Sequence, residues 1–167
     1  MTAAPKHYEE AILLLDAPMP TGYRQRLTEA RRHLEVAVQA TPKHAPSHAA
    51  LGYTNDHLGR RDEQALACFR EALRLKPSDR IAEVYVLTLL ADMGREKEAL
   101  AGIKFAAPRH KLDLAKLKRE LAAVKFPTDA YHLLMNGFIH ARNFMRSRIS
   151  DEAERIRNKR APGRKRR

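Results

Sequence analysis

One stretch of the chain, residues 51–77, has the pattern of two helices folded back on each other. Gly59 interrupts the pattern and Pro77 ends it, because glycine favours a helix end and proline cannot continue a helix. The second half places small and large apolar side chains three or four positions apart, on one helix face. These are Ala65, Phe69, Ala72 and Leu73. One such hairpin cannot bury its own apolar face, so neighbouring copies are predicted.

The same pattern recurs on both sides of this stretch. Ala30, Ala65 and Ala99 begin the three copies, at spacings of 35 and 34 residues. The upstream copy continues with Leu34, Ala37 and Pro42, and the downstream copy with Ile103 and Ala106. This period resembles the tetratricopeptide repeat, a helix–turn–helix unit of about 34 residues. The resemblance covers residues 6–108 and implies an all-α, right-handed α-solenoid of three helix–turn–helix repeats.

We expect four parts in chain order. Residues 1–108 form the three tetratricopeptide-like repeats, and 109–126 form a helix that caps the last repeat, as solenoids require. Residues 127–160 form a long C-terminal helix, amphipathic and then basic. Residues 161–167 form a disordered basic tail, because a short charged terminus has nothing apolar to bury.

Several helix bounds follow from turn residues. Helices are predicted over 5–16, 23–40, 80–91 and 96–107, with Ser78 or Asp79 as the cap of the third. Between the first two, residues 17–22 contain two prolines and a glycine, which break a helix. This loop is either a tolerated surface insertion or a contact loop at the mouth of a groove.

The C-terminal helix carries an apolar stripe that must dock on something. Its docking residues are Tyr131, Leu134, Met135, Phe138, Met145 and Ile149. The stripe can cover the repeats, fill their groove, or form a homodimer with a second subunit. After it, Ser150 can start a separate helix, or one continuous helix can carry the i,i+4 pairs Arg148–Glu152 and Asp151–Arg155.

Positive charge is concentrated at the C-terminal end. The chain has a net charge of +12, of which residues 142–167 contribute +8 and residues 1–141 only +4. The densest cluster consists of Arg155, Arg157, Lys159, Arg160, Arg164, Lys165, Arg166 and Arg167. Such a cluster binds phosphates by releasing counterions, without reading bases. We therefore expect this region to contact RNA, DNA or another polyanion.

No catalytic motif is found, so we expect a non-enzymatic protein without cofactor or metal. A glycine-rich phosphate loop and a nucleophile with its base are both missing from the sequence. His44 and His48 are four residues apart, but Pro46 separates them and a third ligand is missing. Without a signal peptide or a span of about 20 apolar residues, a cytoplasmic protein is expected, or a nuclear one in a eukaryote.

The tetratricopeptide resemblance implies a concave groove lined by the first helix of each repeat. The groove positions are Ala49, Tyr53, Asp56, His57, Val84, Tyr85, Thr88 and Asp92, to which the first repeat adds Glu9, Glu10, Leu13 and Asp16. The family's tail receptors use Lys, Asn and Arg there to hold a terminal carboxylate. Apolar, aromatic and acidic residues suggest instead a partner peptide or helix of apolar and basic character. Alternatively, Tyr53 and Tyr85 pack against a neighbouring helix.

Together these features predict a protein–protein interaction adaptor with a partner in the groove and a basic C-terminus on a polyanion. A competing hypothesis makes nucleic-acid binding primary and the repeats a spacer or dimerisation platform. A third class, the secretion-type chaperone, matches the chain's length but not its C-terminal basicity.

Overall fold

The structure is a computed structural model, and the part of the chain that it describes consists of α-helices joined by turns. It describes residues 3–17, 22–59, 62–95, 97–99, 101–102 and 129–161, and side chains over the same ranges except 3–5, 62 and 129–142. The main helices are α1 (Ala3–Asp16), α2 (Tyr23–Ala40), α3 (Ala45–Leu58), α4 (Asp62–Leu75), α5 (Arg80–Asp92) and α8 (Asp129–Arg160). None of these residues forms a β-strand, which confirms the all-α class.

The ends of the helices follow the turn residues of the sequence. Gly59 and Gly94 have φ angles of 68° and 73°, a left-handed conformation that glycine adopts without steric cost. Asp79, rather than Ser78, caps α5, because its side chain accepts hydrogen bonds from the backbone N–H groups of Ile81 and Ala82. The bounds of α2 agree with the predicted 23–40. The predicted capping helix at 109–126 and residues 162–167 lie outside the described residues.

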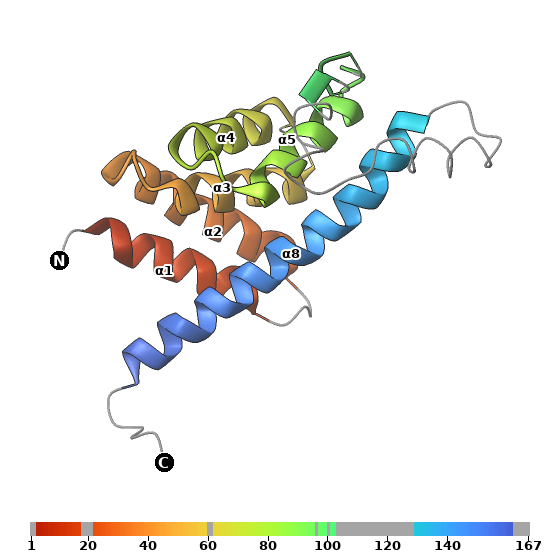
Figure 1. The fold of residues 1–167 in the computed structure, drawn as a ribbon. Helices are drawn as coiled ribbons and strands as arrows, with labels where there is room; N and C mark the ends of the chain where they lie inside the picture. Colours follow the sequence, from red (N-terminus) through yellow and green to blue (C-terminus); the bar gives the residue numbers. More distant parts are fainter. Residues whose placement is uncertain are drawn as a thin grey trace.

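Consecutive helices pack against one another in chain order, from α1 to α5 (Figure 1). The small residues Ala30, Ala65 and Ala72 are fully buried and allow neighbouring helices to approach. Helices α3 and α4 approach closely, so that a Cβ atom on Gly52 would lie 2.9 Å from the Phe69 ring. Phe69 in turn stacks on Tyr85 of α5, with ring centroids 4.4 Å apart. The core is therefore built from small residues set beside large ones.

The long helix α8 returns to the beginning of the chain. It packs on both α5 and α1, although 36 residues separate its start at 129 from the end of α5 at 92. Figure 1 shows α8 running along one side of the other helices. It continues as one helix through Ser150, which decides between the two alternatives for that position. The predicted pairs Arg148–Glu152 and Asp151–Arg155 are not the ones formed: Arg148 pairs with Asp79 and Arg155 with Glu152.

Candidate helix-docking face

From residue 143 onward, where its side chains are described, α8 has an apolar inner face that is buried. Met145, Ile149, Ala153 and Ile156 are each at most 4% exposed and belong to the same core as α1 and α5. Their spacing of three or four residues puts them on one stripe of the helix. The stripe predicted at Met145 and Ile149 is therefore docked within the chain. The other predicted docking residues, Tyr131, Leu134, Met135 and Phe138, lie where side chains are not described.

A bidentate ion pair joins the middle of α8 to the start of α5. The Arg148 guanidinium donates to both carboxylate oxygens of Asp79, each at 2.8 Å. Burial alone would raise the pKa of Asp79, but the Arg148 hydrogen bonds and the Ala82 N–H outweigh it and hold the pKa below its ordinary value. The Asp79 side chain is 6% exposed, so removing Arg148 would leave a buried charge unpaired.

Acidic side chains of α1 receive the basic C-terminal end of α8. Arg157 contacts Asp16 at 2.7 Å, and Lys159 contacts Glu9 at 3.2 Å. Arg160 contacts both Glu9 and Glu10, at 3.0 and 3.1 Å. Burial would raise the pKa of Glu9, but hydrogen bonds from Arg160 and Lys159 lower it overall. The face is therefore complementary to α8 in charge as well as in shape.

Between these two regions, Tyr8 of α1 and His44 before α3 lie close to α8. Their rings meet edge to face, with centroids 4.9 Å apart. Burial raises the pKa of Tyr8, and Glu152 of α8 raises it further. Burial lowers the pKa of His44, and Glu152 opposes this change. Helix α8 thus also influences the region where α1 and α3 meet.

The groove residues predicted from the sequence fall into three groups. Glu9, Glu10 and Asp16 contact α8 directly. By contrast, Tyr53, Tyr85 and Thr88 are buried in the core, with Tyr85 between Phe69 and Tyr53. The remaining positions are the buried Ala49, the partly buried Leu13, Val84, Asp56 and His57, and the exposed Asp92. Tyr85 thus packs against neighbouring helices, as the alternative reading of the sequence had it.

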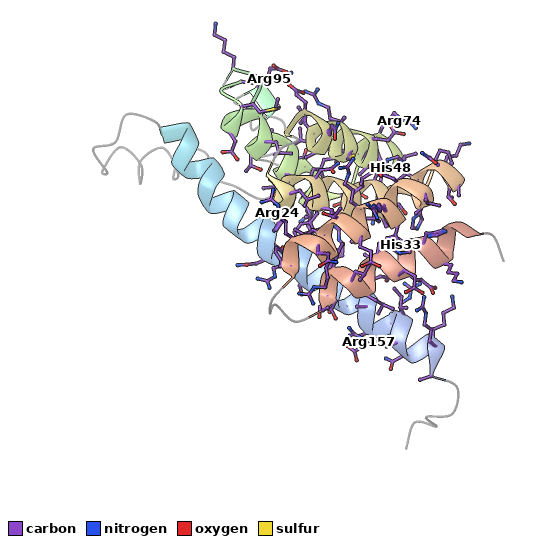
Figure 2. All side chains as sticks on the ribbon, turned by 180° about the vertical axis from the view of Figure 1, so that it is seen from behind. Arg24, His33, His48, Arg74, Arg95 and Arg157 are labelled. Carbon is purple, nitrogen blue, oxygen red and sulfur yellow. The ribbon has the colours of Figure 1, made fainter. Side chains whose placement is uncertain are left out.

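The predicted polyanion residues are only partly described. Arg157, Lys159 and Arg160 pair with α1, and Arg155 contacts Glu152 of its own helix at 3.4 Å. Arg164, Lys165, Arg166 and Arg167 lie outside the described residues. Figure 2 shows Arg157 on the part of α8 beside α1, while Arg74 and Arg95 lie at the far end of the molecule.

Sequence reasoning missed the roles of Arg148 and Tyr8 and recognised Asp79 only as a helix cap. The two members of the Arg148–Asp79 pair are 69 residues apart in the chain, so no local spacing connects them. The histidines considered as metal ligands have other partners: His44 Nδ1 lies 2.7 Å from Ser47 Oγ, and His48 Nε2 lies 2.8 Å from the Pro42 carbonyl oxygen. In the described part of the chain, no three His, Cys, Asp or Glu side chains are grouped as a metal would require.

Comparison of the chain with protein-family models finds no matching family, and comparison with curated proteins finds no match. Of the described helices, none combines the length and the apolar composition that are needed to cross a bilayer. The geometry of the docked helix therefore provides the argument for function.

Proposed function

We propose that this chain is a non-enzymatic adaptor built as a tetratricopeptide-like α-solenoid, with a face that binds a basic amphipathic helix. The recurring residue pattern and the packing of helices in chain order support the solenoid. One observation supports the binding face: α8 lies on α1 and α5 with its apolar stripe buried and its cations on acidic side chains. A surface that accommodates such a helix within the chain can accept one from a partner.

The docked helix also defines what a partner should look like. Apolar residues occupy positions equivalent to 145, 149, 153 and 156, and a basic residue at the position of 148 reaches Asp79. Further basic residues follow about two turns later, opposite the carboxylates of α1. The groove chemistry expected from the sequence, apolar and acidic, agrees with this pattern. The basic C-terminal region adds contact with nucleic acid or another polyanion.

A labelled peptide tests the binding face directly. Its sequence would be residues 143–160 of this chain, and fluorescence anisotropy would measure its binding to the full-length protein. Wild-type protein should bind weakly, because its own α8 competes at high effective concentration. The full-length double variant Arg148→Glu/Ile149→Asp weakens the internal competitor and leaves α1 and α5 unchanged, so it should bind the peptide at least about tenfold more tightly.

The matched control is a peptide that carries the same two substitutions. It should fail to bind either protein, because it lacks the Asp79 partner and one residue of the apolar stripe. Circular dichroism checks that the variant protein keeps its helices. A helical variant that does not bind the wild-type peptide would contradict the proposal.

The competing proposal makes nucleic-acid binding primary and the repeats a spacer or dimerisation platform. The high positive charge at the C-terminal end favours it. Deletion of residues 158–167 and measurement of nucleic-acid affinity across a salt series test this hypothesis. Unchanged affinity would exclude the tail as the binding element. A pull-down with and without nuclease then separates direct protein partners from those bridged by nucleic acid.

A further inference from the structure

The two ends of the docked part of α8 are held by contacts of different strength. Asp79 is buried and accepts two hydrogen bonds from Arg148. At the other end, Arg157 and Lys159 are 54% and 63% exposed, against 36% for Arg148, and their partners Asp16 and Glu9 are 16% and 18% exposed, against 6% for Asp79. Exposed pairs contribute little to stability and are screened by salt. The C-terminal end is therefore the part of α8 that is easier to release from the other helices.

The cations at this end are already occupied by carboxylates of α1. All three guanidinium nitrogens of Arg160 are engaged, Nε and Nη2 with Glu9 and Nη1 with Glu10. Lys159 shares Glu9, and Arg157 contacts Asp16. A phosphate that approaches the docked helix would therefore find every nitrogen of Arg160, Nη2 of Arg157 and Nζ of Lys159 already paired with carboxylates. Its contacts with these atoms compete with the α1 carboxylates.

The outward side of the docked helix does not offer an equivalent surface. The exposed acidic residues Asp151 and Glu154 are balanced by the exposed Arg146 and Arg155, so this side carries no excess of positive charge for a phosphate backbone. A nucleic acid supplies one charge per about 1.7 Å of duplex, whereas Glu9, Glu10 and Asp16 together supply three charges over about 10 Å of α1, at 1.5 Å per residue. The duplex therefore offers these cations a denser array of negative charge than α1 does.

We propose that the C-terminal end of α8 is a binding site for the phosphate backbone of nucleic acid, and that Glu9, Glu10 and Asp16 mask this site. Nucleic-acid binding and docking of this end on α1 therefore exclude one another. This inference rests on the proposed function, because it assumes that the basic region contacts a polyanion. Nucleic acid is favoured over an anionic membrane because the apolar residues of this end, Ala153 and Ile156, are buried against the core.

The test neutralises the covering carboxylates in the full-length chain. The variant Glu9→Gln/Glu10→Gln/Asp16→Asn should bind a fluorescein-labelled 20-base-pair DNA duplex about tenfold more tightly at low salt. Each exposed ion pair that holds α8 on α1 weakens duplex binding a few-fold, and the variant removes these pairs. The control is Glu35→Gln/Glu71→Gln/Glu98→Gln. These carboxylates also pair with arginines, so the change in net charge is the same and basic side chains lose a partner in both variants. The control should change the affinity by less than about twofold, because distant charges are screened.

A second set of variants separates masking of the site from other effects of the three α1 substitutions. In Arg157→Gln/Lys159→Gln/Arg160→Gln the site itself is removed, so duplex affinity should fall and the three α1 substitutions should have no further effect. Hydrogen exchange adds a readout of release. Saturating duplex should speed amide exchange in residues 3–16 and 153–160 and leave α4 unchanged.

Three results would overturn the inference: an equal gain in both carboxylate variants, no gain in either, or tighter binding to vesicles of anionic phospholipid than to duplex. The labelled peptide used to test the docking face contains no nucleic-acid step. If the peptide binds and the α1 substitutions do not raise duplex affinity, masking fails and the adaptor proposal stands. If the α1 substitutions raise duplex affinity and the peptide does not bind, the masking inference stands and the adaptor proposal fails.

Discussion

Arg148 and Asp79 form a two-point contact: Nη1 and Nη2 of the guanidinium donate to different oxygens of the carboxylate, each at 2.8 Å. The same Asp79 side chain caps α5 through the N–H groups of Ile81 and Ala82. One carboxylate thus both begins a helix and holds a second helix that lies far away in the sequence. Substitutions at Asp79 can separate these two roles.

Asp79→Asn should keep the helix cap and lose the ion pair, since asparagine is also a good cap. We expect the free energy of unfolding to fall by about 1–3 kcal/mol, because Arg148, whose side chain is 36% exposed, loses its charged partner. Asp79→Ala should cost about 1 kcal/mol more through loss of the cap. Urea denaturation measures both, and equal stability of the asparagine variant and the wild type would contradict the role of the pair.

Stability should decrease in acid partly through Asp79. The pKa of Asp79 is lowered from 3.8 in the folded chain, so the folded state binds fewer protons and the pair stabilises it fully above about pH 4. This contribution is lost as the pH falls through the lowered folded value. Because Glu9, Glu71 and Glu98 also have lowered pKa values, the relevant quantity is the stability difference between wild type and Asp79→Asn. That difference should shrink below pH 4, and a constant difference down to pH 2 would argue against the linkage.

Gly52→Ala should destabilise the packing between α3 and α4. The added Cβ would lie 2.9 Å from two carbons of the Phe69 ring, closer than carbon atoms can pack. Overpacking costs about 1–3 kcal/mol, and the better helix propensity of alanine offsets up to about 1 kcal/mol of this. Thermal denaturation should therefore show a lower midpoint. Combining the substitution with Phe69→Leu should cost less than the sum of the two single changes, and simple additivity would contradict the proposed clash.

Cys68 should react slowly with thiol reagents in the folded chain. Burial raises the pKa of its thiol from 9.0 to about 11, and the thiolate is the reactive form. At pH 8 the thiolate fraction should be about 100-fold lower than in the unfolded chain, because each pKa unit is a factor of ten. Absorbance with a disulfide reagent, with and without denaturant, measures this ratio. Similar rates in both conditions would show that the thiol is not protected.

The prediction from sequence succeeded where the physics is local. The predicted helix at 23–40 has the bounds of α2, and the turn glycine Gly59 has the left-handed backbone that such a position favours. The cap of α5 was narrowed to two neighbouring residues, of which Asp79 is the one used. Each of these features depends on side chains within about one helical turn, so the sequence alone contains the information.

The docking of the C-terminal helix could not be derived in the same way. The apolar stripe of α8 showed that this helix must be covered, but not whether by its own chain or by a second one. The continuity of α8 through Ser150 depends on Ile149, Ala153 and Ile156, which are buried on the same core. The three α1 carboxylates were expected to face a groove, yet nothing in the sequence linked them to the basic end of α8.

What the sequence by itself determined is therefore the helical class, the positions of several turns and the location of the excess positive charge. These depend on periodicity, on glycine and proline, and on composition. Only the tertiary structure decided that α8 lies on α1 and α5, that Arg148 pairs with Asp79 and that Arg157, Lys159 and Arg160 meet Glu9, Glu10 and Asp16. The physical reason is that ion pairs and apolar packing act between groups that are close in space, and distance along the chain does not reveal which groups those are.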